Sequence, residues 1–500
     1  MTFRTFATSA RKYTLLALAA LLLSAMNAFA ARSDLTLGMV LEPPHLDPTA
    51  GAAAAIDEIV YANIFEGLTR IGPNGEVKPA LAESWEISPD QKTYVFHLHQ
   101  DVKFHDGTAF DAGDVKFSLD RARAPESTNA QKALFAAIDR VEVIDPATVK
   151  VTLKFPSGDF LYNMGWGDAV VVAPESAAGN KEKPVGTGPF KFQNWAKGSQ
   201  IVLAANPDYW GEKPALDRAT FRFIPDPAAA TAALLAGDVQ AFPSFPAPEA
   251  VPQFQADPRF QAVIGTTEGE TILAENNARP PFDNPKVRQA IAHAIDRKAV
   301  IDGAMFGFGT PIGSFFPPHH PAYVDLTATS KYDPELAKKL LAEAGYPKGF
   351  TITLKLPPPT YARRGGEIIA AQLRAVGIEA RIIPVEWAQW LDQVFKGRDY
   401  DLTIVAHTEP NDLNIFARDD YYFSYHNPAF KALIAQIEAT SDEAKRTALY
   451  QRAQQILSDD APVAFLFQLP KLGIWDAKLE GLWKNYPIQA NDLTAVKWTE

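Results

Sequence analysis

Strands and helices alternate along the segment that begins at Phe350, and this alternation limits the possible folds more than any other feature. The residue pattern predicts strands at Phe350–Leu356, Ile378–Ile383 and Asp401–Ala406, with helices at Tyr361–Val376 and Glu386–Phe395 between them. Strands connected through helices at this spacing form mostly parallel sheets covered by helices. We therefore expect an α/β fold in this part of the chain.

A shorter unit of the same kind lies nearer the N-terminus. The pattern predicts a strand at Arg218–Phe223, an alanine-rich helix at Pro227–Ala236 that stops at Gly237, and a short strand at Val239–Phe242. A further helix is expected over Ala53–Phe65. Two α/β regions predict two lobes, and ligands favour the crevice at the carboxyl ends of such strands.

The stretch that begins at Trp85 has a different character. Thr93–His99 alternates apolar and polar residues, which is typical of a half-buried strand, and Asp114–Ala124 favours a helix. A strand predicted over Thr148–Lys154 follows an Asp145-Pro146 turn, as in a hairpin. This stretch therefore predicts a small α+β insert. A chain of 500 residues has room for about three domains.

The first thirty residues have the three-part layout of a secretory signal peptide. Three basic residues and no acid precede an apolar run at Leu15–Leu23, and Ala28-Phe29-Ala30 supplies small residues before a cut at Ala31. The apolar run is shorter than the roughly 20 residues that span a bilayer. We predict a signal peptide over residues 1–30, and export by the general route because Arg11-Lys12 is not a twin arginine.

The chain has no cysteine, which removes several kinds of chemistry at once. Disulfides, thiolate zinc sites, iron–sulfur clusters and cysteine nucleophiles are excluded. A bacterial lipoprotein also needs a cysteine at its processed N-terminus, so we expect no lipid anchor. Loss of the three basic residues of the signal would lower the formal charge from −11 to −14, and this acidic balance argues against a nucleic-acid binder. These features predict a freely diffusing periplasmic protein.

The chain carries none of the common enzyme motifs that we sought. It has no G-x-S-x-G nucleophile turn, no H-E-x-x-H zinc helix and no G-x-x-x-x-G-K-[ST] phosphate loop. The glycines of Gly186–Pro189 are interpreted as a tight turn at a crossover. The pairs His97/His99 and His319/His320 each offer only two local ligands, so no metal and no cofactor is predicted. A secreted hydrolase stays as an alternative, which turnover of a peptide library would support.

Nine short segments, spread over almost the whole chain after the signal, together carry a resemblance to a known family. The segments are Leu46-Asp47-Pro48, Ile64–Leu68, Pro79–Ser88, Thr93–Leu98, Val102–Gly107, Gly186–Phe190, Asn206–Trp210, Pro281–Arg297 and Ala344–Tyr346. Together they resemble the extracytoplasmic solute-binding proteins of ABC importers, in the family that includes dipeptide-, oligopeptide- and nickel-binding members. Each segment is weak alone, and their order and spacing carry the resemblance.

The resemblance implies a two-lobed α/β periplasmic binding protein with mixed sheets, an interlobe cleft and an additional α+β domain. It would divide the chain into a signal peptide (1–30), the first part of lobe I (31–83), the additional domain (84–184), the second part of lobe I (185–269), lobe II (270–476) and a return to lobe I (477–500). Hinges would lie near Gly269 and Ala477. It also implies a monomer that closes around a buried small-molecule solute and delivers it to an inner-membrane ABC permease.

The resemblance also suggests which residues choose the solute. Peptide-binding relatives have an acid after the strand that matches Asp401–Ala406, and this acid pairs with the α-ammonium of the peptide. Asp412 matches it best, with Glu409 as the alternative, and His407 and Asn411 lie in the same stretch. A carboxylate at the carboxyl end of a strand suits an ammonium group excluded from water, although Asp412 could equally be an exposed turn residue or a helix N-cap.

Five other residues complete the predicted ligand-binding set. Glu42 and Pro43 follow the first strand and should border the cleft, and Asn276 is a family cleft position. Arg363 could reach a ligand carboxylate and Trp387 could stack on a ligand, although exposure and core packing are their simpler roles. The predicted function is a receptor for a peptide or peptide-like amine. Receptors for a nickel or other metal chelate, for haem, or for an amino-sugar or opine-type solute stay as alternatives. His407 and Leu413 replace the family's tryptophan and proline, which leaves room for a modified peptide or another amine-bearing solute.

Overall fold

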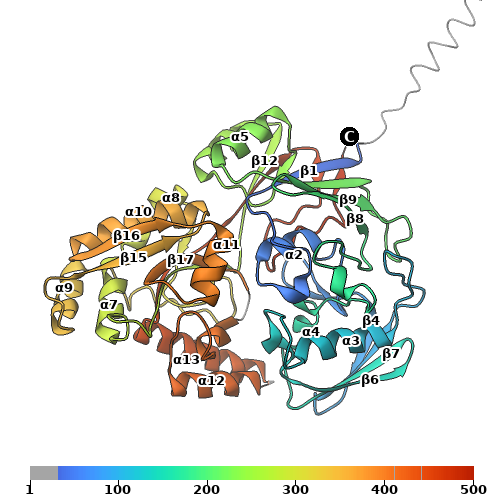
Figure 1. Ribbon diagram of the computed structural model, residues 1–500, viewed down its shortest axis with the longest axis horizontal. Coiled ribbons are helices and arrows are strands. Elements are labelled where there is room, and N and C mark those ends of the chain that lie inside the picture. Colours follow the sequence, from blue (N-terminus) through green and yellow to red (C-terminus); the bar gives the residue numbers. More distant parts are fainter. Residues whose placement is uncertain (1–31, 410–411, 441, 500) are drawn as a thin grey trace, which may run out of the picture.

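Three main sheets organise the protein, whose computed structural model describes residues 32–409, 412–440 and 442–499. Figure 1 shows the seven-stranded sheet with α5 at the top, the six-stranded sheet with α8 to α10 at the left, and the four-stranded sheet at the lower right. The predicted signal peptide, residues 1–30, lies outside the described residues. Within the described ranges, no helix is both long enough and apolar enough to cross a membrane.

The seven-stranded sheet forms lobe I. Its order is β12 (Phe260–Gly265), β19 (Lys471–Asp476), β11 (Ala241–Phe242), β1 (Asp34–Met39), β10 (Arg218–Phe223), β9 (Gln200–Ala205) and β8 (Phe190–Ala196). β1 pairs in parallel with β10 and with β11, and helix α5 (Pro227–Ala236) connects those two strands. Asp226 caps α5 by accepting a hydrogen bond from Ala229 N, and Gly237 ends the helix at a φ of 78°, which glycine adopts without strain. The predicted strand–helix–strand unit is therefore present.

The six-stranded sheet forms lobe II. Its order is β14 (Thr310–Pro311), β18 (Val463–Gln468), β13 (Glu270–Glu275), β17 (Leu402–His407), β15 (Phe350–Leu356) and β16 (Ile378–Pro384). The parallel strands β15, β16 and β17 are connected by α10 (Thr360–Ala375) and by α11 (Trp387–Trp390), which continues as a π-helical turn. The remaining helices of this lobe are α7 (Pro285–Ala294), α8 (Arg297–Met305), α9 (Pro334–Glu343), α12 (Pro428–Glu438) and α13 (Glu443–Asp460). The alternation predicted from Phe350 onward is present, with mixed strand pairing.

The four-stranded antiparallel sheet lies in the insert, in the order β4 (Ala82–Ile87), β5 (Thr93–Leu98), β7 (Thr148–Leu153) and β6 (Ile138–Asp145). Every second residue of β5 is buried, as its alternating sequence predicts, and helix α3 (Ala112–Arg123) packs on β6 and β7. Short elements around it are β2 (Thr69–Ile71), β3 (Val77–Pro79) and α4 (Phe160–Asn163). The boundaries 84–184 of the additional domain stay a prediction.

Separate apolar clusters lie under the sheets. One joins β1, β10 and α2 (Ala54–Val60) in lobe I, a second fills the insert, and a third lies under α12 and α13 in lobe II. The largest cluster combines α7, α8 and α10 of lobe II with α5 and α6 (Val251–Ala256) of lobe I. The two lobes therefore meet through apolar contacts near the points where the chain crosses between them.

Two crossover segments connect the lobes, and they lie side by side. Leu469 N donates a hydrogen bond to Gly269 O at 2.7 Å, and Gln468 Nε2 donates one to Thr267 O at 2.8 Å. The first crossover contains Gly269, where a hinge is predicted. The second precedes Lys471 rather than lying near Ala477, because β19 pairs with β11 and β12 and so belongs to lobe I. The predicted end of lobe II at residue 476 is therefore too late in the chain.

Helix α2 (Ala54–Val60) is shorter than the helix predicted over Ala53–Phe65. After it, Ile64 O accepts a hydrogen bond from Gly188 N at 3.0 Å, so the chain forms backbone contacts with another segment instead of a further helical turn. A Cβ at Gly186 would lie 1.9 Å from Ile64 O, which only glycine avoids. The predicted tight turn over Gly186–Pro189 is therefore a close approach of two backbones.

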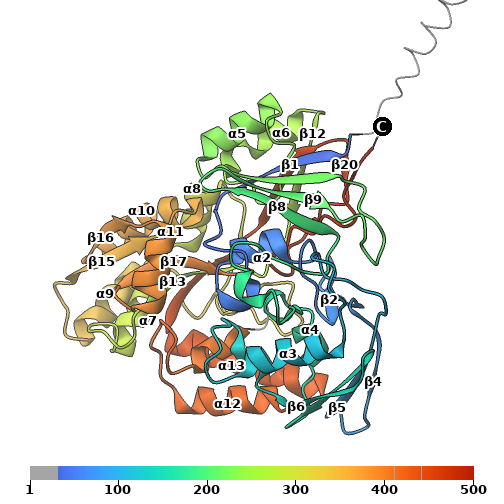
Figure 2. The same cartoon turned by 45° about the vertical axis from the view of Figure 1, so that its right-hand side comes forward.

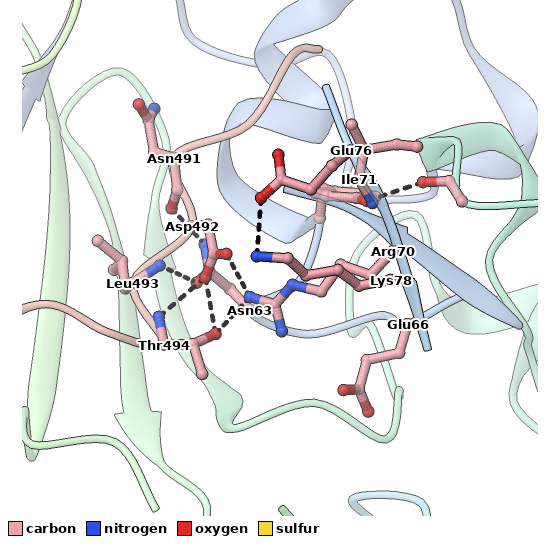
Figure 3. A network of polar contacts seen from close by, with 12 residues as sticks. Asn63, Glu66, Arg70, Ile71, Glu76, Lys78, Asn491, Asp492, Leu493 and Thr494 are labelled. Atoms are coloured by element: carbon pink, nitrogen blue, oxygen red, sulfur yellow. Dashed lines mark hydrogen bonds and ion pairs between the residues drawn. The ribbon is translucent and has the colours of Figure 1, made fainter. Parts of the chain in front are cut away.

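The segment after β19 returns across lobe I, where β20 (Leu479–Glu480) pairs with β21 (Lys497–Trp498). Figure 3 shows how side chains fasten this segment to the start of the lobe. Arg70 donates hydrogen bonds to Asp492 and, at 2.7 Å, to Thr494 Oγ1. Asn63 Oδ1 accepts a hydrogen bond from Leu493 N at 3.0 Å. Residues far apart in sequence thus complete one lobe.

Candidate functional site

A cavity of about 280 Å³ lies between the two lobes. Lobe I contributes residues that follow β1 and β11, and lobe II contributes residues that follow β15, β16 and β17. The lining includes Val40, Leu41, Glu58, Phe245, Lys471 and Tyr486 from lobe I, and Tyr361, Trp387, Trp390, His407, Glu409, Arg418 and Tyr421 from lobe II. The cavity therefore lies at the carboxyl ends of strands from both sheets, where ligands are expected.

Aromatic side chains form much of the lobe II wall. The rings of Trp387 and Trp390 stack with centroids 5.0 Å apart and planes within 3°. Trp390 is buried and donates from Nε1 to Thr403 Oγ1 at 2.9 Å, so it has a packing role. Trp387 is half-buried over it and lines the cavity, as the stacking hypothesis requires. A flat apolar face on this wall suits an aliphatic or aromatic part of a solute.

Three polar side chains converge at the end of β17. One ligand atom from each of His407, Glu409 and Asp412 lies within 4.8 Å of the others. Asp412 begins a 3-10 helix, Asp412–Ala417, and is buried rather than exposed. The ring of His407 is buried, and its Nε2 makes a 2.8 Å hydrogen bond with Tyr422 OH. This cluster could hold an ammonium group or, by its donor types, a metal ion.

The electrostatics of the cluster favour a positively charged partner. Burial raises the pKa of Glu409 and of Asp412, and the charge of Glu409 raises that of Asp412 further. Burial also lowers the pKa of His407 to about 3, so this ring is uncharged near neutral pH. Arg418 is the cation that acts on all three residues. A second positive charge would stabilise the ionised carboxylates.

Further acids lie across the interface from this cluster. Asp57 of α2 and Asp168 of the insert each have a buried Oδ1 without a hydrogen-bond partner. Burial raises the pKa of Asp168 to about 8, and the charge of Glu409 adds to this rise. Burial likewise raises the pKa of Asp57, again with contributions from Asp168 and Glu409. Each of these acids therefore disfavours ionisation of the others, and a cation between them would relieve this repulsion.

A smaller cavity of about 100 Å³ continues from the same cluster between lobe II and the insert. Glu409 lines both cavities, whereas Asp412 lines the smaller one. On its far side Arg446 approaches Asp159 of the insert at 3.5 Å. The predicted anchor Asp412 therefore lines the smaller cavity next to the insert, whereas Glu409 lines both this cavity and the main one.

The structure separates several predicted site residues from the cavity. Glu42 accepts hydrogen bonds from Trp195 Nε1 and Gly198 N, both at 2.9 Å, and does not line the cavity. Pro43, Asn276 and Arg363 also lie outside the cavity lining. The lining residues that follow β1 are Val40 and Leu41. Asn276 donates from Nδ2 to the carbonyl of Arg398 at 2.9 Å, and Arg363 donates to the carbonyls of Pro357 and Val385. Asn411 lies outside the described residues.

Three charged residues of the lining were not predicted, nor was the phenol Tyr486 that contacts one of them. Glu58, Lys471 and Tyr486 come from lobe I, and Arg418 comes from the loop after the predicted anchor. Glu58 Oε1 accepts a 2.5 Å hydrogen bond from Tyr486 OH. Arg418 donates to Asn414 Oδ1 at 3.0 Å. Only Arg418 had a usable sequence signal, because it lies six residues after Asp412 on the same loop.

Direct contacts between the lobes hold the cavity closed on one side. Arg364 of α10 makes two hydrogen bonds with Glu249 of lobe I, at 2.9 and 2.7 Å. Thr360 Oγ1 donates to Pro246 O at 3.0 Å, and Gln489 Nε2 donates to Thr408 Oγ1 at 2.8 Å. The structure is therefore that of a closed interlobe cleft.

Two lobes joined by paired crossovers, with a lined cavity between them, define a bacterial binding protein of the lobe-closing class. Comparison with protein families matches residues 76–412 to bacterial extracellular solute-binding proteins, family 5 (middle part), and the chain belongs to this family. Figure 2, turned from Figure 1, shows the helices of the two lobes and of the insert around the shared centre.

Individual relatives agree with this assignment. The chain is 33% identical to the dipeptide-binding protein of Escherichia coli, over 78% of this chain and 81% of that protein. It is 31% identical to the glutathione-binding protein GsiB of Salmonella typhi, over 92% and 94%. The solved structure of the periplasmic binding protein DppA of Helicobacter pylori with the peptide STSA has a TM-score of 0.87 and 28% identity, over 94% and 99%. These matches confirm the two-lobed class.

Proposed function

We propose that this protein is the periplasmic substrate-binding component of an ABC importer, and that it captures a peptide or peptide-like amine by lobe closure. The observation that carries the proposal is the cluster of Glu409 and Asp412 at the end of β17, beside a closed interlobe cavity. The relatives named for dipeptides and glutathione support this class of solute.

The two carboxylates of the cluster are only partly compensated by positive charge. Burial raises the pKa of both, so their ionised forms are disfavoured, and the charge of Arg418 opposes this only in part. An ammonium group between them would restore a favourable charge pair away from water. Trp387 and Tyr361 would then contact the apolar parts of the solute. A solute with one ammonium group and an apolar side chain fits this arrangement.

The cellular setting follows from the family and the sequence. We propose cleavage after residue 30, a freely diffusing protein without a lipid anchor, and a monomer that docks on an inner-membrane ABC permease. The protein acts by binding, and we propose no catalytic role. Its relatives are named as binding proteins, which supports this view.

Native mass spectrometry of freshly purified protein is the first test, because it identifies a trapped solute. An amine-bearing solute is expected, and uncharged sugars alone would contradict the proposal. Asp412→Asn and Glu409→Gln should each weaken binding of that solute by about 2–5 kcal/mol, as for truncation of one partner in a buried charge pair. Asp420→Asn is the matched control, because Asp420 is an exposed acid on the same loop. Unchanged affinity in both site variants would remove the cluster from the amine site.

A receptor for a metal chelate is the second candidate, favoured by one observation. His407, Glu409 and Asp412 offer an imidazole nitrogen and two carboxylates within 4.8 Å of one another, a donor set that suits divalent transition metals. Metal analysis of protein purified without chelators separates the two candidates. Stoichiometric metal that disappears in His407→Gln would favour the chelate, whereas metal-free protein that binds an amine would favour the peptide-like solute.

A further inference from the structure

A buried lysine lies in the lobe I wall of the cavity. Lys471 begins β19, directly after the second crossover, and only 3% of its surface is exposed. The residue is part of the cavity lining. Its Nζ lies 5.4 Å from the ring centroid of Tyr486, which also lines the cavity. The ammonium group is therefore withdrawn from bulk water and lies beside a residue of the cavity wall.

The hydrogen bonds of Lys471 leave it without a counter-charge. Its Nζ donates to Trp483 O at 2.7 Å and to Asn485 O at 3.5 Å, which uses two of the three donors of an ammonium group. Among the described residues, no carboxylate forms an ion pair with it. Glu58 of α2, also in lobe I, is the carboxylate whose charge acts on it, and that carboxylate accepts a hydrogen bond from Tyr486 OH.

Two other cations near the cavity differ from Lys471 in burial or in having an ion-pair partner. Arg418 is half-buried, donates to Asn414 Oδ1, and its charge acts on Glu409 and Asp412. Arg363 lies outside the lining and forms an ion pair with Glu386 at 3.5 Å. A buried cation without a paired anion is unfavourable, and an anion that enters the cavity would remove this cost.

We infer that Lys471 binds an anionic group of the solute, a carboxylate, on the lobe I wall of the cavity. This inference rests on the proposed function, because it gives the amine-binding cavity a second, oppositely charged contact. The solute would then carry an ammonium group held by lobe II and a carboxylate held by lobe I. One zwitterionic solute would contact both lobes and so favour their closure. The class is that of free peptides and related amino acids, not of uncharged sugars or simple amines.

Binding of a carboxylate at Lys471 and binding of an ammonium group at Glu409 and Asp412 should change the number of bound protons in opposite directions. Burial lowers the pKa of Lys471 to about 7, while the charge of Glu58 opposes this shift. Tyr486 is the other titratable group packed against it, and its pKa is raised by burial. Above pH 7 the free lysine is neutral, so binding a carboxylate must take up about one proton. Pairing of an ammonium group with Glu409 and Asp412 favours their ionised forms, so any proton exchange at that site is a release.

The test compares two peptide libraries that differ only in this anion. Dipeptides with a free carboxylate and the same dipeptides as C-terminal amides are offered separately to the wild-type protein and to Lys471→Met, and bound peptides are measured by native mass spectrometry. The wild type should favour the acids by about 10- to 100-fold, as for a hydrogen bond to a charged group. Lys471→Met should lose this preference. Lys484→Met is the control for net charge, because Lys484 is exposed and outside the lining.

Each outcome distinguishes the two proposals. If the wild type binds neither library, the peptide-like amine is wrong and the carboxylate site falls with it. If it binds acids and amides equally, or if Lys471→Met keeps the preference, only the role of Lys471 is overturned. Calorimetry of the wild type at pH 8 in two buffers of different ionisation enthalpy gives a second readout. Acids should take up about one more proton than their amides, and an equal count would also overturn the inference.

Discussion

Replacing Arg364 with methionine should weaken solute binding without touching the cavity. The guanidinium of Arg364 and the carboxylate of Glu249 form two hydrogen bonds of 2.9 and 2.7 Å between the lobes, and the side chains are 37% and 33% exposed. At this exposure the pair contributes about 0.5–1 kcal/mol, because water and salt screen it. Because the two side chains belong to different lobes, we expect the pair to form only when the lobes are closed. Its loss should therefore raise the Kd of the solute by about 2- to 5-fold.

A second arginine on the same helix provides the matched control. Arg374 of α10 makes a similar two-bond pair with Glu379, at 2.9 and 3.1 Å, but both residues belong to lobe II. Arg374→Met should leave the Kd unchanged. Isothermal titration calorimetry with the solute found by mass spectrometry measures both variants, at about 50 mM and at 500 mM salt. The effect of Arg364→Met should shrink at the higher salt.

A double-mutant cycle tests whether Arg364 and Glu249 act on closure through one shared interaction. Glu249→Gln alone should act like Arg364→Met, and the double variant should be no weaker than either single variant, because both remove one interaction. Equal Kd values for Arg364→Met and Arg374→Met would show that the pair does not act on closure. Fully additive effects of the two single variants would lead to the same conclusion.

Three further changes test other parts of the structure. Asp492→Ala leaves the half-buried Arg70 with Thr494 but without its charged partner, and it should lower the free energy of unfolding by about 1.5–3 kcal/mol in a denaturant titration, whereas an unchanged value would show that the pair does not stabilise the lobe. Trp387→Leu removes the aromatic face over the cavity and should weaken binding by about 0.5–1.5 kcal/mol, whereas an unchanged Kd would exclude stacking. Binding of an amine without a carboxylate should strengthen as pH rises through the raised pKa of Glu409 and Asp412, because only their ionised forms pair with ammonium. Affinity that is flat or falls with pH would contradict this.

Local sequence patterns predicted the elements of the fold well, because their signals lie within short stretches. The alternation in β5 and the strand–helix units around α5 and α10 each depend on spacing within about fifteen residues. The two differences have distant causes. Ile64 leaves the helix because its carbonyl meets Gly188, and β19 joins lobe I because its partners are β11 and β12. Neither contact has a sequence signal near the residue that it changes.

Residues of the candidate site could likewise be predicted only where they lie close in sequence to the end of a predicted strand. His407, Glu409 and Trp387 follow the ends of strands that the pattern located, and the structure places all three in the cavity lining. Glu58 and Lys471 could not be found in this way, because helix α2 and the second crossover reach the cavity only through the tertiary fold. Glu42 shows the converse: it is close to the first strand, but its carboxylate is engaged by Trp195 and Gly198.

The place of β19 in the seven-stranded sheet sets the order in which the molecule can be built. β19 lies between β12 and β11, so β12 has no neighbour in this sheet until Lys471–Asp476 has been synthesised. A nascent chain can complete lobe II before it can complete lobe I, although lobe I begins first. A fragment that ends before β19 should not be expected to yield a stable lobe I.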